Sequence, residues 1–222
     1  MGSAQYDQLF TETFEALASG SYAPLDLLTK WWQTAESSDI IVDHRAAALA
    51  TFDAESGYPD SRIVYVRPPR ESGFEFYTDR SSVKGVQLQK HPQAAITMLW
   101  HNAWIQVRVR GDVTLTSRDS DLAYWQARPV ENRLAGYSSQ QSQAVASEAE
   151  RDANFAAAKA LYQEGDVPLP ERWGGFVLLP REIEFWRGTD HRMHRRVRLQ
   201  WQGSEQPNLN TADGWSHTLL NP

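Results

Sequence analysis

The stretch AAITMLWHNAWIQVRVRGDVTLTS, residues 94–117, decides the fold class of this protein. Through most of it apolar and polar residues alternate, as Val107 does with Arg108, and a period of two is typical of a strand with one buried face. The pattern therefore predicts strands over residues 94–100 and 104–117. An antiparallel, mainly β protein is the first hypothesis that follows.

The same period continues on both sides of this stretch, and helical patterns interrupt it. Further strands are predicted at 47–53, 62–68, 73–79, 174–180, 182–188 and 196–203. Helices are predicted at 23–37, 81–90, 117–127 and 147–164, with an irregular tail at the end of the chain. The sequence contains neither a Gly-x-Gly-x-x-Gly turn nor a Walker phosphate loop, which argues against a nucleotide-binding parallel sheet. The layout favours a mainly β (α+β) fold, a closed or split β-barrel with peripheral helices.

Length, composition and charge narrow the class of protein further. The 222 residues fit a single domain over 23–222, preceded by a weakly structured, peripheral segment over 1–22. The absence of cysteine excludes disulfides, thiolate metal sites and cysteine nucleophiles. No signal-peptide pattern and no bilayer-spanning apolar run occur, so a cytoplasmic location is expected. The net charge of −6 argues against partners such as nucleic acid or an anionic membrane.

The densest cationic run is HRMHRRVR, residues 191–198. In an extended chain alternate residues share a face, and four basic side chains of this run would then point the same way. They are Arg192, His194, Arg196 and Arg198. Such a face can hold an anion through planar guanidinium contacts, or it can be a solvated surface or an ion-paired dimer edge. No metal site is expected at the histidines, because the neighbouring arginines oppose a cation.

Two more cationic features belong to the predicted strand 62–68 and the predicted helix 81–90. Arg62 and Arg67 are five residues apart on one strand, so they are predicted to face opposite sides unless a bulge intervenes. Lys84 follows two serines near the start of its helix, where N–H groups, hydroxyls and an ammonium can seat a phosphate. An exposed arginine and an ordinary capped surface helix are the alternative interpretations.

Polar residues after the predicted strands form two further candidate sites. Tyr124 and Arg128 are four residues apart, so they share a helix face that can hold a phosphate or carboxylate. A tyrosine packed beneath an exposed arginine is the commoner arrangement. Gln140-Gln141-Ser142, in a polar loop that begins near Gly136, can offer hydrogen bonds to a flat heterocycle, although loops of this kind are usually only solvated.

Taken in order along the chain, these positions resemble the pyridoxamine 5′-phosphate oxidase family. The likeness runs from about residue 44 to residue 200. Three stretches carry it: RIVYVR…FYTDRSSVKG (62–85), ARPVENRLAGYSSQQS (127–142) and WGGFVLLPREIEFWRGTDHRMHRRVR (173–198). The family consists of split β-barrel homodimers that hold FMN at the subunit interface. The resemblance therefore implies an FMN-dependent oxidase that acts with O2.

The resemblance also implies where FMN is held. From one subunit, contacts are expected from Arg62, Tyr77, Thr78, Lys84 and Gln106. From the other subunit, they are expected from Gln141, Ser142, Trp186 and Arg196. Further cofactor contacts are expected beside Arg62, at Ile63, Val64 and Tyr65. Arg62 and Lys84 supply cations for the flavin phosphate, whereas Trp186 and Gln106 suit the flavin ring.

For the substrate, the family pattern is kept only in part. The family holds the substrate phosphate with Lys, Tyr, Arg and Ser. The matching positions here are Arg67, Tyr124, Arg128 and Asn132. Arg192 and His194 match the pair that stands over the substrate ring, where the resemblance implies that they orient the substrate and assist proton removal. Other departures are Val83 at a position that is often basic, the ending LLNP without an arginine, and the missing basic N-terminal segment.

Three functions remain open at this point. The first is the oxidation of pyridoxine or pyridoxamine 5′-phosphate to pyridoxal 5′-phosphate, favoured by the charges kept in the substrate site. The second is a phenazine-biosynthesis oxidase that aromatises a reduced tricyclic carboxylate, favoured by the altered ends of the chain and by LFTETFEAL, residues 9–17. The third is a non-enzymatic split-barrel protein that binds flavin or haem, in which Arg192 and His194 have no obvious purpose.

Overall fold

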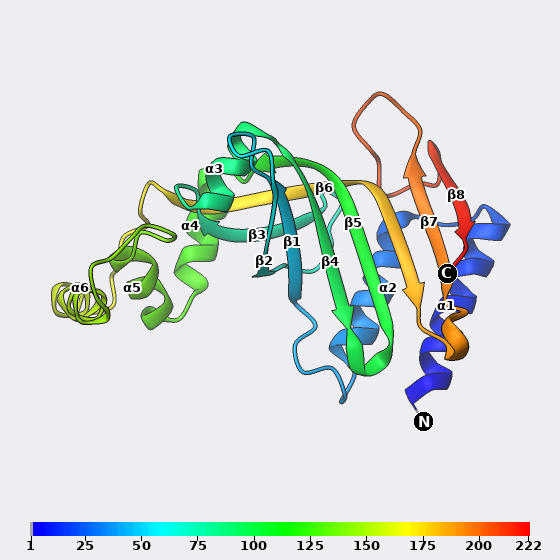
Figure 1. Cartoon of the computed structure of the whole chain (residues 1–222), viewed down its shortest axis with the longest axis horizontal. Coiled ribbons are helices and arrows are strands. Elements are labelled where there is room, and N and C mark those ends of the chain that lie inside the picture. The colour runs from blue at the N-terminus through cyan, green and yellow to red at the C-terminus, as the bar shows by residue number, and fades with distance from the viewer. Residues whose placement is uncertain (1) are drawn as a thin grey trace.

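The computed structural model describes residues 2–222, and in it eight strands form one antiparallel sheet with helices around it (Figure 1). The strands are β1 (Ala46–Phe52), β2 (Pro59–Tyr65), β3 (Phe74–Asp79), β4 (Gln93–Trp100), β5 (Ile105–Leu115), β6 (Trp173–Arg187), β7 (Arg195–Trp201) and β8 (Trp215–Leu220). The α-helices are α1 (Gly2–Ser19), α2 (Pro24–Glu36), α3 (Val83–Lys90), α4 (Arg118–Ala127), α5 (Val130–Ser138) and α6 (Glu148–Leu161). Two 3-10 turns are η1 (His101–Ala103) and η2 (Asp190–Arg192).

Six of the strands close into a barrel. The sheet runs β2-β1-β4-β5-β6-β7-β8, and β3 pairs with β6 off this path. Beyond the end of β2, Val66 bridges to Phe76 of β3, and the Arg67 N–H donates to the Glu75 carbonyl at 2.8 Å. The path β2-β1-β4-β5-β6-β3 therefore returns to β2, while β7 and β8 extend the sheet from the C-terminal half of β6. The predicted mixed fold with a large antiparallel sheet is confirmed.

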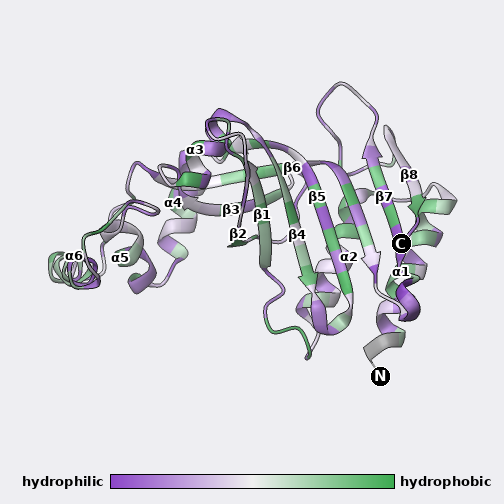
Figure 2. Cartoon of the chain, viewed as in Figure 1, coloured by the Kyte–Doolittle hydropathy of each residue, from purple (hydrophilic) through white to green (hydrophobic). Residues whose placement is uncertain are grey.

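The alternation seen in the sequence gives the barrel its inside and its outside. On β5, Ile105, Val107 and Val109 are at most 2% exposed, whereas Arg108 and Arg110, which alternate with them, are exposed. Hydrophobic and hydrophilic bands alternate along β5 for this reason (Figure 2). The interior is completed from the other strands by Leu49, Phe74, Phe76, Ile96, Met98, Phe176, Leu178, Ile183 and Phe185.

The two strands predicted on either side of Pro180 are one long strand, β6. Pro180 lies opposite Gly111 of β5, where the register shifts and leaves Arg181 without a partner in the ladder. A Cβ on Gly111 would lie 1.9 Å from the carbonyl oxygen of Leu179, so the bulge requires glycine there. A proline has no N–H to donate and is tolerated at such a bulge. The predicted break was wrong because the pairing partner, which the local pattern does not show, accommodates the proline.

The segment 1–22, expected to be weakly structured, contains α1 instead. Tyr6, Phe10 and Leu17 lie on one face of this helix, and each is at most 2% exposed. Their spacing of four and then seven residues forms a narrow helical stripe, which is hard to see among the intervening polar residues. α1 and α2 run beside the part of the sheet that carries β6–β8 (Figure 1).

The junction of α1 and α2 depends on one buried polar pair. The Trp31 indole N–H donates to the Thr13 hydroxyl at 2.9 Å, and both side chains are fully buried. Thr13→Val keeps the shape of the side chain but leaves the indole N–H without an acceptor. The free energy of unfolding, measured by urea denaturation, is therefore expected to fall by about 1–2 kcal/mol. Thr34→Val is the matched control. The hydroxyls of Thr13 and Thr34 both donate to the backbone carbonyl four residues earlier in their helix, but Thr34 lies on the exposed side of α2. Equal losses in the two variants would contradict the prediction.

The remaining elements differ from the predictions mainly in two places. The predicted helices 23–37, 81–90, 117–127 and 147–164 are confirmed as α2, α3, α4 and α6. The helix α5 was not predicted, since its short amphipathic pattern follows directly on Pro129, and the expected irregular tail contains β8. Within residues 2–222, no helix has the length and apolar character needed to cross a membrane.

Candidate functional site

A cavity of about 1060 Å³ opens beside β2, β3 and the start of α3, and it gathers most of the predicted site residues. Small-molecule sites typically occupy about 300–1,000 Å³, so the space suits one large ligand or two smaller ones. Thirteen of the predicted cofactor and substrate residues line it: Arg62, Ile63, Val64, Tyr65, Arg67, Tyr77, Thr78, Lys84, Tyr124, Arg128, Asn132, Gln141 and Ser142.

One end of this cavity is built around a buried lysine. The Ser82 hydroxyl caps α3, and Lys84 in the first turn is only 8% exposed. Its ammonium donates to the Gln141 amide oxygen at 2.6 Å and to the Ser82 hydroxyl at 3.2 Å. Burial, and then the nearby Arg62, lower the pKa of Lys84 to about 8. Among the residues described, Lys84 forms no ion pair, so this end presents a cation that lacks an anion.

Arg62 and Arg67 line the same cavity, which corrects the prediction that they face opposite sides. The reason is that β2 ends at Tyr65, so the period of two no longer relates the two arginines. Arg62 pairs with Asp60 and donates to the Thr51 hydroxyl at 2.5 Å, which holds its guanidinium beside the lysine end. Arg67 lies further along, toward the aromatic end.

Three stacked aromatic rings form the other end of the cavity. The Tyr77 and Tyr124 rings lie 3.9 Å apart at an angle of 13°, and the Trp173 ring is within 6 Å of both. A Cβ on Gly175 would lie 2.8 Å from the Tyr77 ring, so the second glycine of WGGF makes room for the stack. Burial, and then Glu75, raise the pKa of Tyr77 to about 12, which keeps the phenol protonated as a hydrogen-bond donor.

Two arginines lie over this aromatic stack. The Arg67 guanidinium is 5.2 Å from the centre of the Tyr124 ring, and the Arg128 guanidinium is 4.8 Å from that of Trp173. Burial lowers the pKa of Arg128, and its Nη1 is buried without a hydrogen-bond partner among the described residues. Buried donors are normally paired, so this atom indicates that an acceptor from a ligand belongs here. The pair offers planar donors to a phosphate or carboxylate.

The other predicted residues form a second cluster on the outer face of the sheet. Gln106, Trp186 and Arg196 are direct neighbours on β5, β6 and β7. The His194 ring lies 4.9 Å from the Trp186 ring. Arg196 is held by Glu184, which accepts from its Nε and Nη2 at 2.9 Å each. We call Gln106, Trp186, Arg192, His194 and Arg196 the strand cluster.

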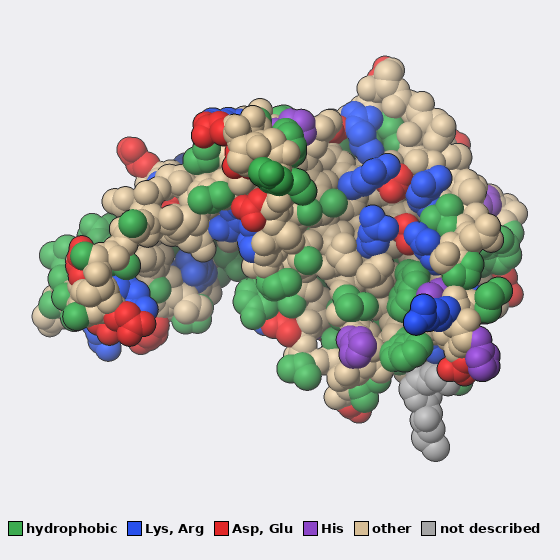
Figure 3. Space-filling model, viewed as in Figure 1, with side chains coloured by type: hydrophobic (Ala, Val, Ile, Leu, Met, Phe, Trp, Pro, Cys, Tyr) green, Lys and Arg blue, Asp and Glu red, His purple; other side chains and the backbone are tan. Residues whose placement is uncertain are grey.

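Charges of both signs surround the strand cluster. Arg108 donates to Glu184 at 3.3 Å, and Arg110 donates to Glu182 at 2.9 Å. Figure 3 shows these basic and acidic side chains interleaved over the region of β5–β7, beside apolar ones. Arg198 has a buried Nε without a partner among the described residues. The face is therefore neither uniformly basic nor a simple solvated surface.

The expected row of alternating basic side chains from Arg192 to Arg198 does not form. The 3-10 turn η2 interrupts the run, and His191 and Arg192 have φ angles of +56° and +61°, so Arg192 is not in register with the strand. Only from Arg195 onward is the chain extended. The Thr189 N–H donates to His194 Nδ1 at 3.2 Å, which orients the imidazole against Trp186.

Helix α1 ties down both strands that flank this turn. Arg187, at the end of β6, donates to the Asp7 carboxylate at 2.9 Å. Arg195, at the start of β7, donates to the Thr11 hydroxyl at 3.2 Å and lies 4.6 Å from the centre of the Phe10 ring. The N-terminal helix thus supports the loop that presents Arg192 and His194.

The strand cluster and the cavity lie at opposite ends of β6. Trp173 begins the strand in the cavity and Trp186 lies near its far end, about 40 Å further along the strand. Gln141 and Ser142 line the cavity of the same chain, together with Arg62 and Lys84, whereas Gln106 is the neighbour of Trp186. The division of these residues between two subunits stays a prediction. Pairing of distant strands, invisible in the local sequence, decides which residues are neighbours.

Two residues that shape the site were not predicted. Trp173 completes the aromatic stack, and Glu184 holds Arg196. Trp173 stands in the WGGF motif and so was visible within a quoted motif. Ser82, one of the two serines expected to help seat a phosphate, contacts Lys84. Nothing in the pattern distinguishes Glu184 from an ordinary surface carboxylate. Among residues 2–222, no group of three or more His, Cys, Asp and Glu side chains is placed to hold a metal ion.

Comparison with protein families assigns both halves of the chain. Residues 33–162 match the family described as pyridoxamine 5′-phosphate oxidase. Residues 173–222 match the pyridoxine 5′-phosphate oxidase C-terminal dimerisation region, which includes β6–β8 and most of the strand cluster. The predicted oxidase family is thereby confirmed.

Individual relatives agree with this assignment. A pyridoxine/pyridoxamine 5′-phosphate oxidase of Alkalilimnicola ehrlichii is 39% identical over 86% of this chain and 92% of its own. One from Shewanella pealeana is 35% identical over 90% and 89%. Among solved structures, PhzG of Burkholderia lata in complex with tetrahydrophenazine-1-carboxylic acid superimposes with a TM-score of 0.81 at 28% identity, covering 90% of this chain and 93% of its own. Together these matches show that the chain belongs to the pyridoxamine 5′-phosphate oxidase family.

Proposed function

We propose that the protein is an FMN-dependent oxidase that converts pyridoxine or pyridoxamine 5′-phosphate to pyridoxal 5′-phosphate, with O2 reduced to H2O2. The observation that carries the proposal is one cavity with two separate cationic ends. Lys84 and Arg62 form one end, and Arg67 and Arg128 form the other. A phosphorylated cofactor and a phosphorylated substrate need these two anion seats. The relatives that share 33–39% identity with this chain are named for this reaction.

The cavity suits the parts of FMN. The unpaired ammonium of Lys84, the Ser82 hydroxyl and Arg62 fit the flavin phosphate. Thr78, which shares the Gln141 acceptor with Lys84, and Tyr77, at the aromatic end, offer hydroxyl groups to the sugar chain or the ring edge. When bound, FMN supplies the hydride acceptor and the group that reacts with O2.

The chain's own residues bind and orient the substrate. Arg67 and Arg128 hold its phosphate, and the buried, unpaired Nη1 of Arg128 gains the acceptor that it lacks. Tyr124, whose ring centre lies 5.2 Å from the Arg67 guanidinium, places its phenol at the same anion, and Asn132 adds an amide donor. The aromatic stack excludes water from one side of the cavity.

The site is completed by a second copy of the chain. The strand cluster lies at the far end of β6, and all of it except Gln106 belongs to the region that matches the dimerisation region of the family. A twofold-symmetric dimer can place the strand cluster of one subunit over the cavity of the other. Gln106, Trp186 and Arg196 of the partner subunit then close the flavin site, and Arg192 and His194 of the partner subunit stand over the substrate.

Lys84 is expected to make FMN affinity depend on pH. In the free protein its pKa is about 8, and a bound phosphate dianion raises this pKa, because opposite charge stabilises the ammonium. At pH 7 the lysine is charged in both states, whereas above pH 8 binding must take up a proton. The dissociation constant of FMN, measured by fluorescence quenching, should therefore rise by up to about tenfold per pH unit above pH 8.

Lys84→Met is the control for this dependence. Its affinity for FMN should be weaker and should not change across the same pH range. A wild-type dissociation constant that stays constant between pH 7 and pH 9.5 would contradict the assignment of the phosphate to Lys84.

Oxygen consumption by the FMN-loaded protein tests the reaction itself. With pyridoxine 5′-phosphate, uptake of one O2 for each aldehyde formed, with H2O2 as the second product, supports the proposal. Unphosphorylated pyridoxine serves as the control. It should react far more slowly, because it lacks the phosphate that Arg67 and Arg128 bind. Tight FMN binding without O2 uptake from either phosphorylated substrate would overturn the proposed substrate.

A second function is supported by the solved structure from Burkholderia lata, whose ligand is tetrahydrophenazine-1-carboxylic acid. Arg67 and Arg128 can bind a carboxylate as well as a phosphate, and Asn132 replaces the family's serine. In this alternative the protein aromatises a reduced phenazine carboxylate. O2 uptake with that substrate, and none with pyridoxine 5′-phosphate, would establish the alternative.

A further inference from the structure

Arg172, just before β6, joins two segments that both reach the phosphate end of the cavity. Its Nε donates to the Asp79 carboxylate at 2.8 Å. Its Nη2 lies 2.9 Å from each of three backbone carbonyl oxygens, those of Gly136, Tyr137 and Ser139. These carbonyls end α5, where a helix leaves its last acceptors unpaired and favours a positive charge.

One of the two segments that Arg172 joins leads to Lys84 and the other leads to Gln141, and these two side chains form a short hydrogen bond. On one side, Asp79 is 5% exposed at its side chain and accepts from the N–H and the hydroxyl of Ser81, which sets the turn before Lys84. On the other side, the chain leaves α5 and reaches Gln141 two residues after Ser139. The Gln141 amide oxygen then accepts from Lys84 at 2.6 Å and from the Thr78 hydroxyl at 2.8 Å.

Little else holds the loop between α5 and α6, residues 139–147. Its backbone and side chains otherwise make only local bonds, such as the Ser139 hydroxyl to the Ala135 carbonyl. Among the described residues, its hydrogen bonds to elements outside α5 and α6 run through Arg172 and Gln141 alone. Without Arg172, the position of Gln141 would depend only on its own hydrogen bonds with Lys84 and Thr78.

We propose that Arg172 and Asp79 are a positioning pair that holds the Gln141 loop against Lys84 and so sets the affinity for FMN. The inference rests on the proposed function, which places the flavin phosphate at Lys84. Neither Arg172 nor Asp79 lines the cavity, so the pair acts through Gln141 and through the first turn of α3. Removal of the pair should loosen the phosphate seat and leave the aromatic end of the cavity intact.

The test is FMN binding to the apoprotein, followed by quenching of flavin fluorescence. Arg172→Met should raise the dissociation constant by about tenfold or more, because it removes charge-assisted hydrogen bonds from both segments. The turnover number at saturating FMN should stay within about twofold of wild type, since the residues that orient the substrate are untouched. Arg172→Lys keeps the charge at the end of α5 but lacks the planar fork, so it should bind FMN with intermediate affinity and serves if Arg172→Met does not fold.

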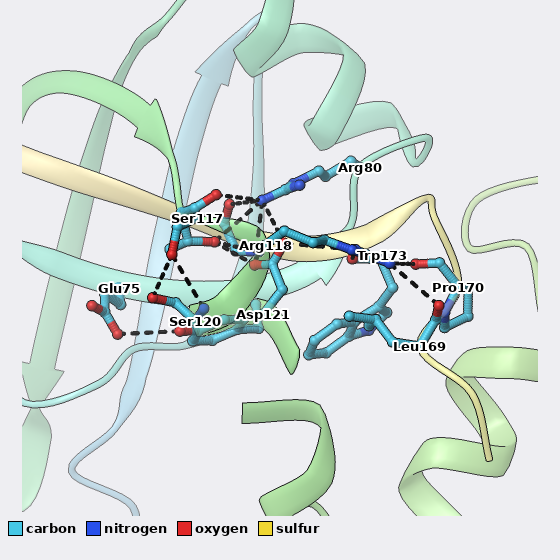
Figure 4. Close-up of polar contacts among 12 residues, drawn as sticks. Glu75, Arg80, Ser117, Arg118, Ser120, Asp121, Leu169, Pro170 and Trp173 are labelled. Atoms are coloured by element: carbon cyan, nitrogen blue, oxygen red, sulfur yellow. Dashed lines mark hydrogen bonds and ion pairs between the residues drawn. The ribbon is translucent and has the colours of Figure 1, made fainter. Parts of the chain in front are cut away.

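Arg118→Met is the matched control for a general loss of stability. Arg118 contacts the chain on both sides of Arg172 and donates to the carbonyls of Leu169, Pro170 and Trp173 at 3.3, 2.9 and 2.7 Å (Figure 4). It too bridges three carbonyls and lies near a buried carboxylate, that of Asp121, but within residues 2–222 it makes no hydrogen bond or ion pair with the Gln141 loop. This variant should lower the melting temperature to a similar degree and leave the FMN dissociation constant within about twofold of wild type.

A double-mutant cycle with Gln141→Ala separates positioning from simple destabilisation. If Arg172 acts mainly through Gln141, then Arg172→Met should cause a much smaller further loss of FMN affinity once Gln141 is alanine, and only the part that runs through Asp79 and α3 should remain. Additive losses of FMN affinity in the double variant, or an unchanged dissociation constant in Arg172→Met, would overturn this inference but not the proposed function. Failure of the wild-type apoprotein to bind FMN would instead overturn the proposed function.

Discussion

Two variants that are each nearly inactive, Lys84→Met and His194→Ala, should recover about one quarter of wild-type activity when their subunits are mixed. Lys84 lies in the cavity and His194 lies in the strand cluster at the other end of β6. If each site combines the cavity of one subunit with the strand cluster of the other, a mixed dimer has one site with both defects. Its second site carries neither defect.

The expected recovery follows from counting sites. Random exchange makes about half of the dimers mixed, and one of the two sites in each mixed dimer is intact, so about a quarter of all sites work. The measurement is oxygen uptake at an FMN concentration that saturates wild-type sites but not Lys84→Met sites, after co-refolding of the two variants. The control mixes Lys84→Met with Arg62→Ala, which both affect the cavity and should not restore activity. No recovery with the first pair would show that each site comes from a single chain.

Loss of the His194 side chain should lower the turnover number by about 10²-fold or more and leave FMN affinity within about threefold of wild type. The Thr189 N–H donates to His194 Nδ1, so the neutral imidazole carries its proton on Nε2. His194 therefore donates a hydrogen bond from Nε2, which suits an oxygen that gains negative charge as the substrate loses a proton and a hydride. The strand around Arg196 and Trp186 holds the ring in place.

His194→Gln is the informative second variant, because its amide also donates and should keep part of the activity, unlike His194→Ala. Arg192→Ala is expected to resemble His194→Ala, since Arg192 ends η2 and His194 follows two residues later on the same loop. Turnover at the wild-type level in both alanine variants would contradict the role of this pair over the substrate. A large loss of FMN affinity in either variant would place the residue in the flavin site instead.

Much of the fold was predictable because it depends on short-range patterns. Period-two alternation around Val107 and Arg108 identified β5, and the turn chemistry around Ser81 and Ser82 identified the start of α3. α1 was missed because its apolar stripe is narrow. β8 was missed because the pairing with β7 that stabilises it is not visible in its own short pattern.

The sequence by itself determined which residue types were available for the site and, through its resemblance to a known family, the order in which they occur. Lys84, Arg128 and the run from Arg192 to Arg196 were all recognisable as cationic positions without a structure. The contacts that hold the site together were not recognisable, because Arg172 meets Asp79, and Gln141 meets Lys84, only after the chain has folded.

Only the tertiary structure decided how the site residues are grouped. Barrel closure at Val66 and Phe76 turns Arg67 into the same cavity as Arg62, against the period of two. The length of β6 separates this cavity from Trp186, so that the predicted site residues of one chain form two separate groups. Both results come from hydrogen bonds between strands far apart in the sequence, and a local pattern carries no information about such pairings.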